Sequence, residues 1–373
     1  MSYTPSSAIK NASLGRNLAI LIVISLIGAG CWMFRSNMPK IPESTESCAE
    51  PIVIPGLLLS FPTPQTRLDE TNNPAVYMPT ESGRIESSWY GSTRTRKSGK
   101  LFLPAFHEGV DIAPTERDSK GRAKDPVFAV ADGRVGYISR VAGNSSYGIY
   151  IVLLHQDRLG EYYTLYSHLA SAGNDLKEGD TVLRGAEIGR IGNTSTLGIP
   201  VQRSHLHFEF GTILNDRFGD WFRSKKLKPF HGRLHGYNLA GLNPVELFPY
   251  MTNGQHFIFQ QYITNCPVAF RIIVPVPGKP DYYRRYPLLW VGDDPSGAGA
   301  LVMDVSEGGV PLQARAATEE ESATLQKNKP RVLEAFPDVL NRNGSRLIVE
   351  QNDTWTLGRN GKQWLEILMY RND

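Results

Sequence analysis

The sequence predicts a mainly β protein: an antiparallel β-sheet domain with a groove, preceded by an N-terminal transmembrane helix and followed by a smaller C-terminal α+β domain. Three observations support this fold class. An uncharged apolar run lies near the N-terminus, short β-rich runs fill the middle of the chain, and the last third mixes strand-like segments with a helix start signal. The 373 residues also exceed what one ordinary core organises. The expected boundaries are a cytoplasmic tail at 1–16, a transmembrane anchor at 17–35, a linker at 36–80, the β domain at 81–250 and the C-terminal domain at 251–373.

The run Leu18–Phe34 is apolar apart from Ser25 and carries no charge, and basic residues stand on both sides of it. Its length is near the lower limit for a helix that crosses a bilayer. The small residues at 28–30 leave a cleaved signal peptide open. The residues before Cys31 are similar to a lipoprotein cleavage box. Such a box has a branched apolar residue three positions before the cysteine, and this chain has Gly28 there. We expect an uncleaved, single-pass anchor.

Charge and cysteine content limit the partners and cross-links. The formal charge of +3 arises from 40 basic and 37 acidic residues, a balance that predicts no nucleic-acid partner. Outside the apolar run the chain has only Cys48 and Cys266. In an oxidising compartment these two could form a disulfide, and two unpaired thiols are the equal alternative.

The composition changes after the anchor. Residues 36–80 are rich in Pro, Ser, Thr and Glu and are expected to form a tether. From 83 to 250 the pattern becomes short β-rich runs separated by Gly, Asn and Asp, with almost no helical periodicity. The runs are PVFAVA, GRVGYIS, YGIYIVLLH, YYTLYSHL and HLHFEF. This pattern favours an antiparallel β domain whose loops surround a groove.

The last third of the chain contains strand-like segments at FIFQQYI, FRIIVPV and YPLLWVG. A helix is expected to begin at Thr318, because TEEE has capping-box spacing and fills the first turn with acidic residues. The chain is expected to end in a hairpin of RLIVE and QWLEILMY, across a turn region that contains Asn360 and Gly361.

Three separate fragments carry the histidines of interest: HEGVD at 107–111, YSHL at 166–169 and HLHFE at 205–209. His107 and Asp111 stand four apart with Gly109 between them, which favours a loop leading into a strand over a helix. Alone, such a pair is usually a solvated surface pair.

His205 and His207 share one face of a predicted strand, because successive side chains on a strand alternate. Leu206 and Phe208 then enter the core while both imidazoles project into a cleft. A pair of exposed strand histidines is the plain alternative.

A catalytic zinc site uses three nitrogen or oxygen ligands of the protein in tetrahedral geometry and leaves one position to water, and the donors available in these fragments fit that count. Hydrolysis of an amide at such a site needs no nucleophilic Ser or Cys. It does need a group that accepts the proton of the attacking water, and imidazoles beside the ligands suit that work.

The ordered motifs together resemble the LytM-type (lysostaphin) zinc metalloendopeptidases, which have a GRI-containing strand, HxGxD, Tyr-x-His-Leu, HLHFE and a final Asn-Pro. The resemblance extends from residue 83 to residue 248. The matching segments are GRIESSW, HEGVDIA, VFAVADGRV, LYSHL, KEGDTVLRGAEIGRIGNT, HLHFEF and NPVELF.

The resemblance implies one zinc ion per chain, held by His107, Asp111 and His207. It makes His168 and His205 the catalytic histidines. Glu209 becomes a candidate partner for a ligand imidazole, and a solvated edge residue is the alternative. The remaining histidines match no motif and are expected to be structural, with His231 and His235 the nearest to substrate; they are His155, His231, His235 and His256.

The sequence departs from the family pattern in two places beside the expected groove. TSTLGIPVQRS at 194–204 occupies a stretch where related sequences look shorter and richer in glycine. The insertion-like stretch at 215–237 interleaves basic and aromatic residues. Such a stretch could attract carboxylates of wall peptides or an anionic glycan. A solvated loop packed by its aromatic side chains is the alternative.

The activity that the resemblance implies is hydrolysis of peptide bonds in peptidoglycan stems or cross-links. The expected location is the bacterial inner membrane, spanned once by residues 17–35, with the catalytic domain in the periplasm. The competing hypothesis is a non-catalytic LytM-type module that binds the wall and activates another wall hydrolase or serves an envelope machine. In either case residues 251–373 could bind the wall or an envelope protein partner.

Overall fold

The computed structural model describes residues 56–98, 101–157, 160–228, 230–276, 278–293, 299–326, 329–340 and 344–371. The expected cytoplasmic tail, the anchor at 17–35 and Cys48 lie outside these residues. Among the helices that the structure describes, none is both long and apolar enough to cross a membrane. The described residues belong to one compact unit, Ile54–Asp373.

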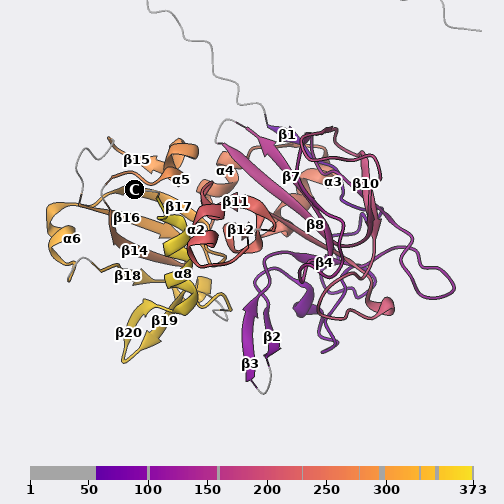
Figure 1. Cartoon of the computed structure of the whole chain (residues 1–373), viewed down its shortest axis with the longest axis horizontal. Coiled ribbons are helices and arrows are strands. Elements are labelled where there is room, and N and C mark those ends of the chain that lie inside the picture. The colour runs from indigo at the N-terminus through magenta and orange to yellow at the C-terminus, as the bar shows by residue number, and fades with distance from the viewer. Residues whose placement is uncertain are drawn as a thin grey trace, which may run out of the picture. The chain divides into compact units, whose positions relative to one another are not determined.

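Nine strands of the described chain form the central sheet, which confirms the predicted antiparallel β fold (Figure 1). Its main path runs β12–β11–β8–β7–β6–β9, while β4 pairs with β11 and β10 pairs with both β5 and β8. Every pairing is antiparallel. The strands are β4 Val110–Ile112, β5 Pro126–Phe128, β6 Gly133–Ser139, β7 Ile149–Gln156, β8 Glu161–Ala172, β9 Thr181–Val182, β10 Glu187–Ile191, β11 Leu206–Ile213 and β12 Leu239–Leu242.

The two faces of this sheet carry different side chains, as strand alternation requires. Leu206 and Phe208 of β11 are fully buried in the main core, as predicted. The opposite face carries His205, His207 and Glu209. Farther along that face, Val152, Leu154 and Ile213 form a second apolar cluster with side chains from the segment that follows β11. The histidine-bearing face is therefore covered at its far end.

That covering segment is the insertion-like stretch at 215–237. It forms α2 (Phe218–Ser224) and two short 3-10 helices, η3 (Gly232–Leu234) and η4 (Gly236–Asn238). Helix α2 buries Phe218, Trp221 and Phe222. The segment is thus packed by its aromatic residues, while Phe230 remains 73% exposed and Tyr237 56% exposed.

The described part of the expected tether packs against the folded domain at two places. Strand β1 (Leu57–Leu58) pairs with β13 (His256–Phe257). Tyr77 forms a bridge with Ile112, so the chain adds a short extended segment outside β4. The side chains of Leu68 and Tyr77 are almost fully buried. The domain boundaries given above remain a prediction.

The segment before β4 differs from the expected strand. GRIESSW forms the 3-10 helix η1 (Ile85–Ser88), because the hydroxyls of Ser87 and Ser88 bond back to the carbonyls of Arg84 and Ile85. A separate hairpin follows, made of β2 (Thr93–Ser98) and β3 (Leu101–Phe106).

The C-terminal region builds a second sheet in the order β15–β17–β16–β14–β18, antiparallel except for the parallel pair β15–β17. Its strands are β14 Phe270–Pro275, β15 Trp290–Val291, β16 Ala300–Val305, β17 Pro311–Ala316 and β18 Arg331–Ala335. The helices from residue 244 onward are η5 Pro244–Leu247, α3 Phe248–Asn253, α4 Phe259–Thr264, α5 Asp281–Arg285, η6 Pro287–Leu289, α6 Glu319–Ala323, α7 Pro337–Leu340 and α8 Arg359–Leu368. Helix α6 begins with the predicted capping box between Thr318 and Glu321.

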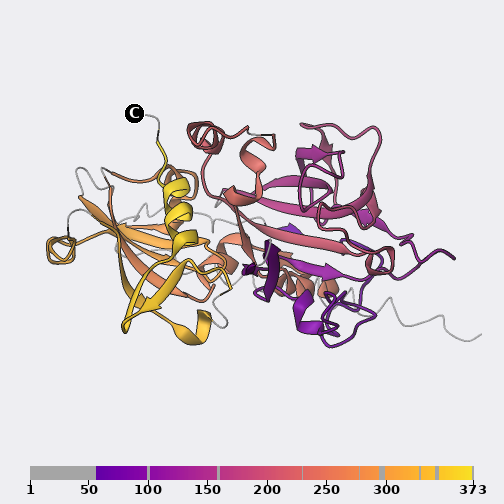
Figure 2. The same cartoon turned by 60° about the horizontal axis from the view of Figure 1, so that its bottom comes forward.

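The expected C-terminal hairpin is wrong in its second half. Strand β19 (Ile348–Gln351) pairs with β20 (Thr354–Leu357) across Asn352 and Asp353, which both adopt positive φ. QWLEILMY instead forms most of α8, the yellow helix in Figure 2. Its Trp364 packs against Phe270 of β14. Its buried residues recur at helical spacing and cover the second sheet.

Two other strand assignments in this region are wrong in part. FIFQQYI is strand only at Phe257 and becomes helix α4, which buries Phe259 and Ile263 one turn apart. YPLLWVG is strand only at Trp290–Val291, because η6 precedes it. In both cases a short apolar run fits a strand and a helix turn equally well.

Candidate metal centre

His107 and Asp111 reach the same point from a loop and from strand β4, as the sequence predicts. The backbone of His107 is held by Ser92, whose carbonyl accepts from His107 N at 3.1 Å. Between His107 and Asp111, the backbone at Gly109 passes so close to β11 that a Cβ atom at this position would lie 2.3 Å from the Phe208 carbonyl oxygen. Only glycine permits this approach. His107 Nε2 consequently lies 3.1 Å from Asp111 Oδ1.

His207 completes the cluster from β11, where it stands directly opposite Asp111 in the β4–β11 register. Its Nδ1 lies 3.0 Å from His107 Nε2 and 3.0 Å from Asp111 Oδ1. The structure thus brings the three predicted metal ligands together, and all three side chains are buried. Their roles remain a prediction.

Each imidazole in the cluster is oriented through its other ring nitrogen. His107 Nδ1 donates to the Trp89 carbonyl at 2.8 Å. His207 Nε2 donates to Glu209 Oε1 at 2.7 Å, which is the partner contact expected for Glu209. The second carboxylate oxygen of Glu209 accepts from the Tyr163 hydroxyl at 3.2 Å. These bonds fix both rings so that His107 Nε2 and His207 Nδ1 are the ring atoms that lie beside Asp111 Oδ1.

The three donors fit a tetrahedral metal ion. Zinc bonds of about 2.0–2.1 Å place neighbouring ligand atoms roughly 3.3 Å apart, and the cluster spacing is 3.0–3.1 Å. Burial lowers the pKa of His207, but hydrogen bonds with Asp111 and Glu209 outweigh it and raise that pKa to about 9. The cluster thus favours positive charge at its centre, as a cation site requires.

His205 lies at the rim of the same cluster. Its Nδ1 donates to the Arg203 carbonyl at 2.7 Å. Its Nε2 is 3.5 Å from Asp111 Oδ1 and, although buried, makes no hydrogen bond with any described residue. A buried nitrogen without a partner is costly, so this atom is placed for a group that binds in the site.

His168 faces His205, with ring centroids 4.9 Å apart. Its Nδ1 donates to the Thr194 carbonyl at 2.9 Å. Its backbone has φ +59°, a conformation that costs a non-glycine residue about 1–3 kcal/mol and is concentrated at functional sites. Burial, and then the neighbouring His205 and His207, hold the pKa of His168 well below its usual value. This imidazole is therefore held in its neutral form.

The remaining histidines lie outside the cluster. His155 is buried between the Asp132 carbonyl and the Thr164 hydroxyl, a structural role that agrees with the prediction. His231 bonds to the Tyr137 hydroxyl at 2.9 Å, and His235 stacks on the aromatic rings of α2. His256 is exposed and contacts the Gly56 carbonyl at 3.0 Å.

Sequence reasoning missed the residues that support the ligands. The Trp89 carbonyl and the Tyr163 hydroxyl orient His107 and Glu209, and the Tyr147 ring lies 5.9 Å from the His207 ring. Burial and the adjacent Glu209 raise the pKa of Tyr147 well above its usual value. Alternation along β8 puts Tyr163 on the face of Ser167, but only the β8–β11 register places it beside Glu209.

Comparison with known proteins agrees with this geometry. Residues 105–217 match the model of Peptidase family M23. The lipoprotein NlpD of Yersinia enterocolitica is 34% identical over 95 residues, which cover 25% of this chain and 82% of that protein. These matches define a peptidase-family domain around the His–Asp–His cluster. The chain belongs to peptidase family M23.

Two solved structures are also similar. A zinc-containing peptidase from Vibrio cholerae is 27% identical, with 36% of this chain and 35% of that chain covered and a TM-score of 0.24. The catalytic domain of lysostaphin from Staphylococcus simulans is 22% identical, with 43% and 89% covered and a TM-score of 0.27. With TM-scores this low, neither superposition bears on the function of this chain.

Proposed function

We propose that this protein is a zinc-dependent endopeptidase that hydrolyses peptide bonds in peptidoglycan stems or cross-links. One observation carries the proposal: a complete His–Asp–His donor set lies beside a buried histidine nitrogen, His205 Nε2, that makes no hydrogen bond within the described chain. Membership of a peptidase family supports the reaction class.

The hydrogen bonds define what each residue would do. Zinc held by His107, Asp111 and His207 would polarise the scissile carbonyl and lower the pKa of water to about 7. Because the Arg203 carbonyl can only accept, His205 carries its hydrogen on Nδ1 and keeps a lone pair on Nε2. His205 Nε2 is therefore the proton acceptor in this mechanism.

His168 is held in the same tautomer by the Thr194 carbonyl. Its other ring nitrogen orients the attacking water or, once protonated, donates to the oxygen of the tetrahedral intermediate. Glu209 fixes the ring of His207 and keeps its Nδ1 lone pair directed at the metal position.

The competing function is a non-catalytic module that binds the wall and activates another hydrolase. Such modules characteristically look depleted in zinc ligands. Here all three ligands and both further histidines converge in one cluster, which favours catalysis. We further propose that residues 17–35 anchor the chain in the inner membrane with the β domain in the periplasm. Residues 251–373 would then bind the wall or an envelope partner.

The test is cleavage of purified peptidoglycan by the full chain in detergent, with and without a zinc chelator. We expect about one zinc per chain and release of cross-link fragments that the chelator abolishes and added zinc restores. Bound zinc with no cleavage, in repeated assays on walls of different cross-link chemistry, would instead support the non-catalytic module.

A further inference from the structure

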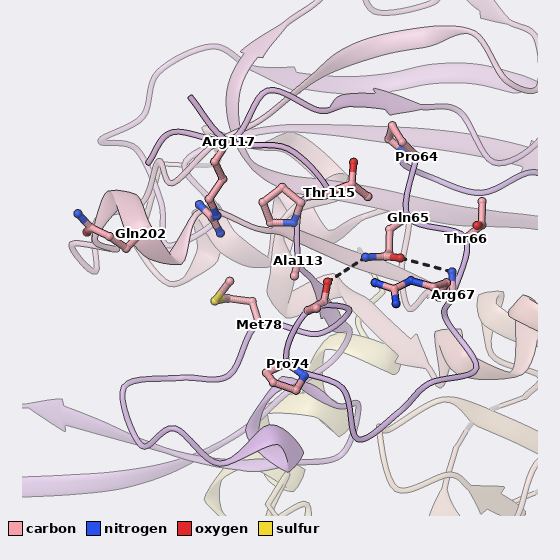
Figure 3. A pocket seen from close by; sticks show the side chains of 12 residues that line it. Pro64, Gln65, Thr66, Arg67, Pro74, Met78, Ala113, Thr115, Arg117 and Gln202 are labelled. Atoms are coloured by element: carbon pink, nitrogen blue, oxygen red, sulfur yellow. Dashed lines mark hydrogen bonds between the residues drawn. The ribbon is translucent and has the colours of Figure 1, made fainter. Parts of the chain in front are cut away.

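A pocket of about 550 Å³ is lined by residues from the segment before β4, from the chain just after β4 and from the segment before β11 (Figure 3). Met78 and Ala113 form part of its lining. The backbone N–H of Met78 donates to the Asp111 carbonyl, and Tyr77 bridges Ile112, so alternation puts Met78 and Ala113 on the same face as Asp111. Ala113 is two residues beyond Asp111, roughly 7 Å along the strand.

A second lining residue ties the pocket to His205. Gln202 belongs to the 3-10 helix η2 (Val201–Arg203), and the carbonyl of its neighbour Arg203 orients the His205 ring. The pocket therefore has lining residues two positions from Asp111 and three positions from His205 along the chain. Because the segment after β11 covers the far end of the same face, the pocket is a natural direction for a bound chain to extend.

One wall of the pocket comes from residues 64–67 and 74–75, which precede the M23 family match. This wall is held in place by its own hydrogen bonds. Gln65 Nε2 donates to the Ala75 carbonyl at 3.0 Å, and the Tyr77 hydroxyl donates to the Leu68 carbonyl at 2.5 Å. The pocket is thus preformed, and one of its walls lies outside the residues that match the family.

Two arginines reach into the pocket from opposite sides, Arg67 and Arg117, and no carboxylate residue lines it (Figure 3). Arg117 is fixed by the carbonyls of Gly121 (2.9 Å), Val201 (3.4 Å) and Ser204 (3.1 Å). These three contacts use three of its five N–H hydrogens, and carbonyl acceptors leave the charge in place.

Each of these arginines has an acidic residue near it, Asp125 for Arg117 and Glu70 for Arg67. Asp125 lies near Arg117, but its oxygens accept from the backbone N–H groups of Thr115 and Glu116 and from the Thr115 hydroxyl. Glu70 lies 3.5 Å from Arg67 in an exposed pair, which contributes little and is easily exchanged. A substrate carboxylate can therefore compete for Arg67.

We propose that this pocket is a subsite that binds a carboxylate of the peptide substrate close to the hydrolysed bond. An extended peptide advances about 3.3 Å per residue, so a chain that leaves Asp111 along β4 reaches Ala113, at the pocket, after about two residues. Proline, alanine and methionine surfaces accept the apolar stem of that residue, and the guanidinium groups accept its charge. The proposal rests on the peptidase function and assigns its substrate class.

The experiment measures kcat/KM of the full, zinc-loaded chain for three peptides. The reference is a soluble cross-linked stem-peptide dimer with all carboxylates free. One derivative carries an amide at the chain-terminal carboxyl group and the other at the acidic residue, so the two sources of the carboxylate are distinguished.

The variants are Arg67→Gln, Arg67→Lys, Glu70→Gln and the control Arg284→Gln. Arg284 matches Arg67 because it is exposed and pairs with an acidic residue three positions away, Asp281, but it lies outside the pocket. Arg67→Gln should lower kcat/KM about tenfold for the peptide with free carboxylates. It should leave kcat/KM unchanged for the derivative in which the carboxylate that binds the pocket is replaced by an amide. Arg67→Lys should restore part of the loss. Glu70→Gln should raise the preference for the peptide with free carboxylates over the amide derivatives, because it removes the carboxylate that pairs with Arg67.

Equal kcat/KM for the acid and both amides in the unsubstituted chain, or an Arg67→Gln effect no larger than that of Arg284→Gln, would overturn the subsite. Calorimetric binding of the same peptides to the zinc-stripped full chain separates this failure from failure of the peptidase function. Arg67-dependent preference in binding without any hydrolysis supports the subsite and contradicts the function. Hydrolysis without preference supports the function and removes the subsite.

Discussion

At the scale of single residues, the candidate metal centre depends on the groups that orient His107 and His207 as much as on these two side chains. Five residues of the site lie in recognisable sequence motifs, so their identity and proximity could be predicted. Their supports could not, because the Trp89 carbonyl and the Tyr163 hydroxyl depend on strand register and on backbone atoms that every residue has. Glu209 was accessible to prediction because it shares a strand face with His207.

Glu209→Gln is expected to weaken zinc binding about tenfold, since the charged acceptor of His207 Nε2 is lost. A competitive titration against a zinc-binding dye measures this change. Glu187→Gln is the control, because Glu187 is an exposed carboxylate on the same sheet. Equal zinc affinities in the two variants would show that Glu209 does not support the ligand.

His155 predicts a pH dependence of stability that is separate from the metal. Burial lowers its pKa to about 4, so the folded state binds fewer protons than the unfolded state between about pH 6.5 and pH 4. The contribution of neutral His155 to the free energy of unfolding is therefore fully present above pH 6.5. It falls as the pH drops through this window, by about 2 kcal/mol between pH 7.5 and pH 5.

His155→Gln should remove this part of the slope. Urea unfolding of the full chain and the variant at both pH values gives the comparison. A slope that is the same in both proteins would mean that His155 does not titrate on unfolding.

At the scale of elements, the antiparallel sheet could be predicted from period-two patterns and turn residues, whereas the short helices could not. QWLEILMY has both a strand-like and a helical pattern. The helix is favoured because its buried residues pack against the second sheet. The insertion at 215–237 left two alternatives open in the sequence. Its packing on the histidine-bearing face resolves the structural question, because Leu234 joins Leu154 and Ile213 in one cluster.

Leu234→Ala should lower the free energy of unfolding by about 2–5 kcal/mol, because the side chain is 3% exposed and fills the space over Leu154. Leu227→Ala in the same insertion should change it by no more than about 0.5 kcal/mol, since Leu227 is 49% exposed. Denaturant unfolding measures both. Similar losses in the two variants would contradict the packing of the insertion on the sheet.

At the scale of the whole molecule, a turn of the second sheet contacts the segment that orients His107, a candidate metal ligand. Tyr90 follows Trp89, and its hydroxyl donates to the Gly241 carbonyl at 2.9 Å. The turn between β16 and β17 places Gly308 so close that a Cβ there would lie 2.3 Å from the Tyr90 hydroxyl oxygen. Sequence patterns do not predict such a contact, because it joins residues that are far apart along the chain.

Gly308→Ala is accordingly expected to cost about 1–3 kcal/mol of unfolding free energy and to weaken zinc binding, because overpacking displaces Tyr90 and with it the Trp89 carbonyl. Gly299→Ala is the matched control, since a Cβ at Gly299 meets no atom within 4 Å. Loss of stability with unchanged zinc affinity would mean that the contact supports the fold alone.

In the proposed mechanism His107, Asp111 and His207 hold zinc and His205 moves a proton, and two variants separate these roles. Zinc content and peptidoglycan cleavage are measured side by side for His207→Ala and His205→Ala. The first variant should lose both metal and hydrolysis. The second should keep about one zinc per chain and lose at least about 100-fold in rate. Release of zinc by His205→Ala, or full activity of that variant, would contradict this division of roles.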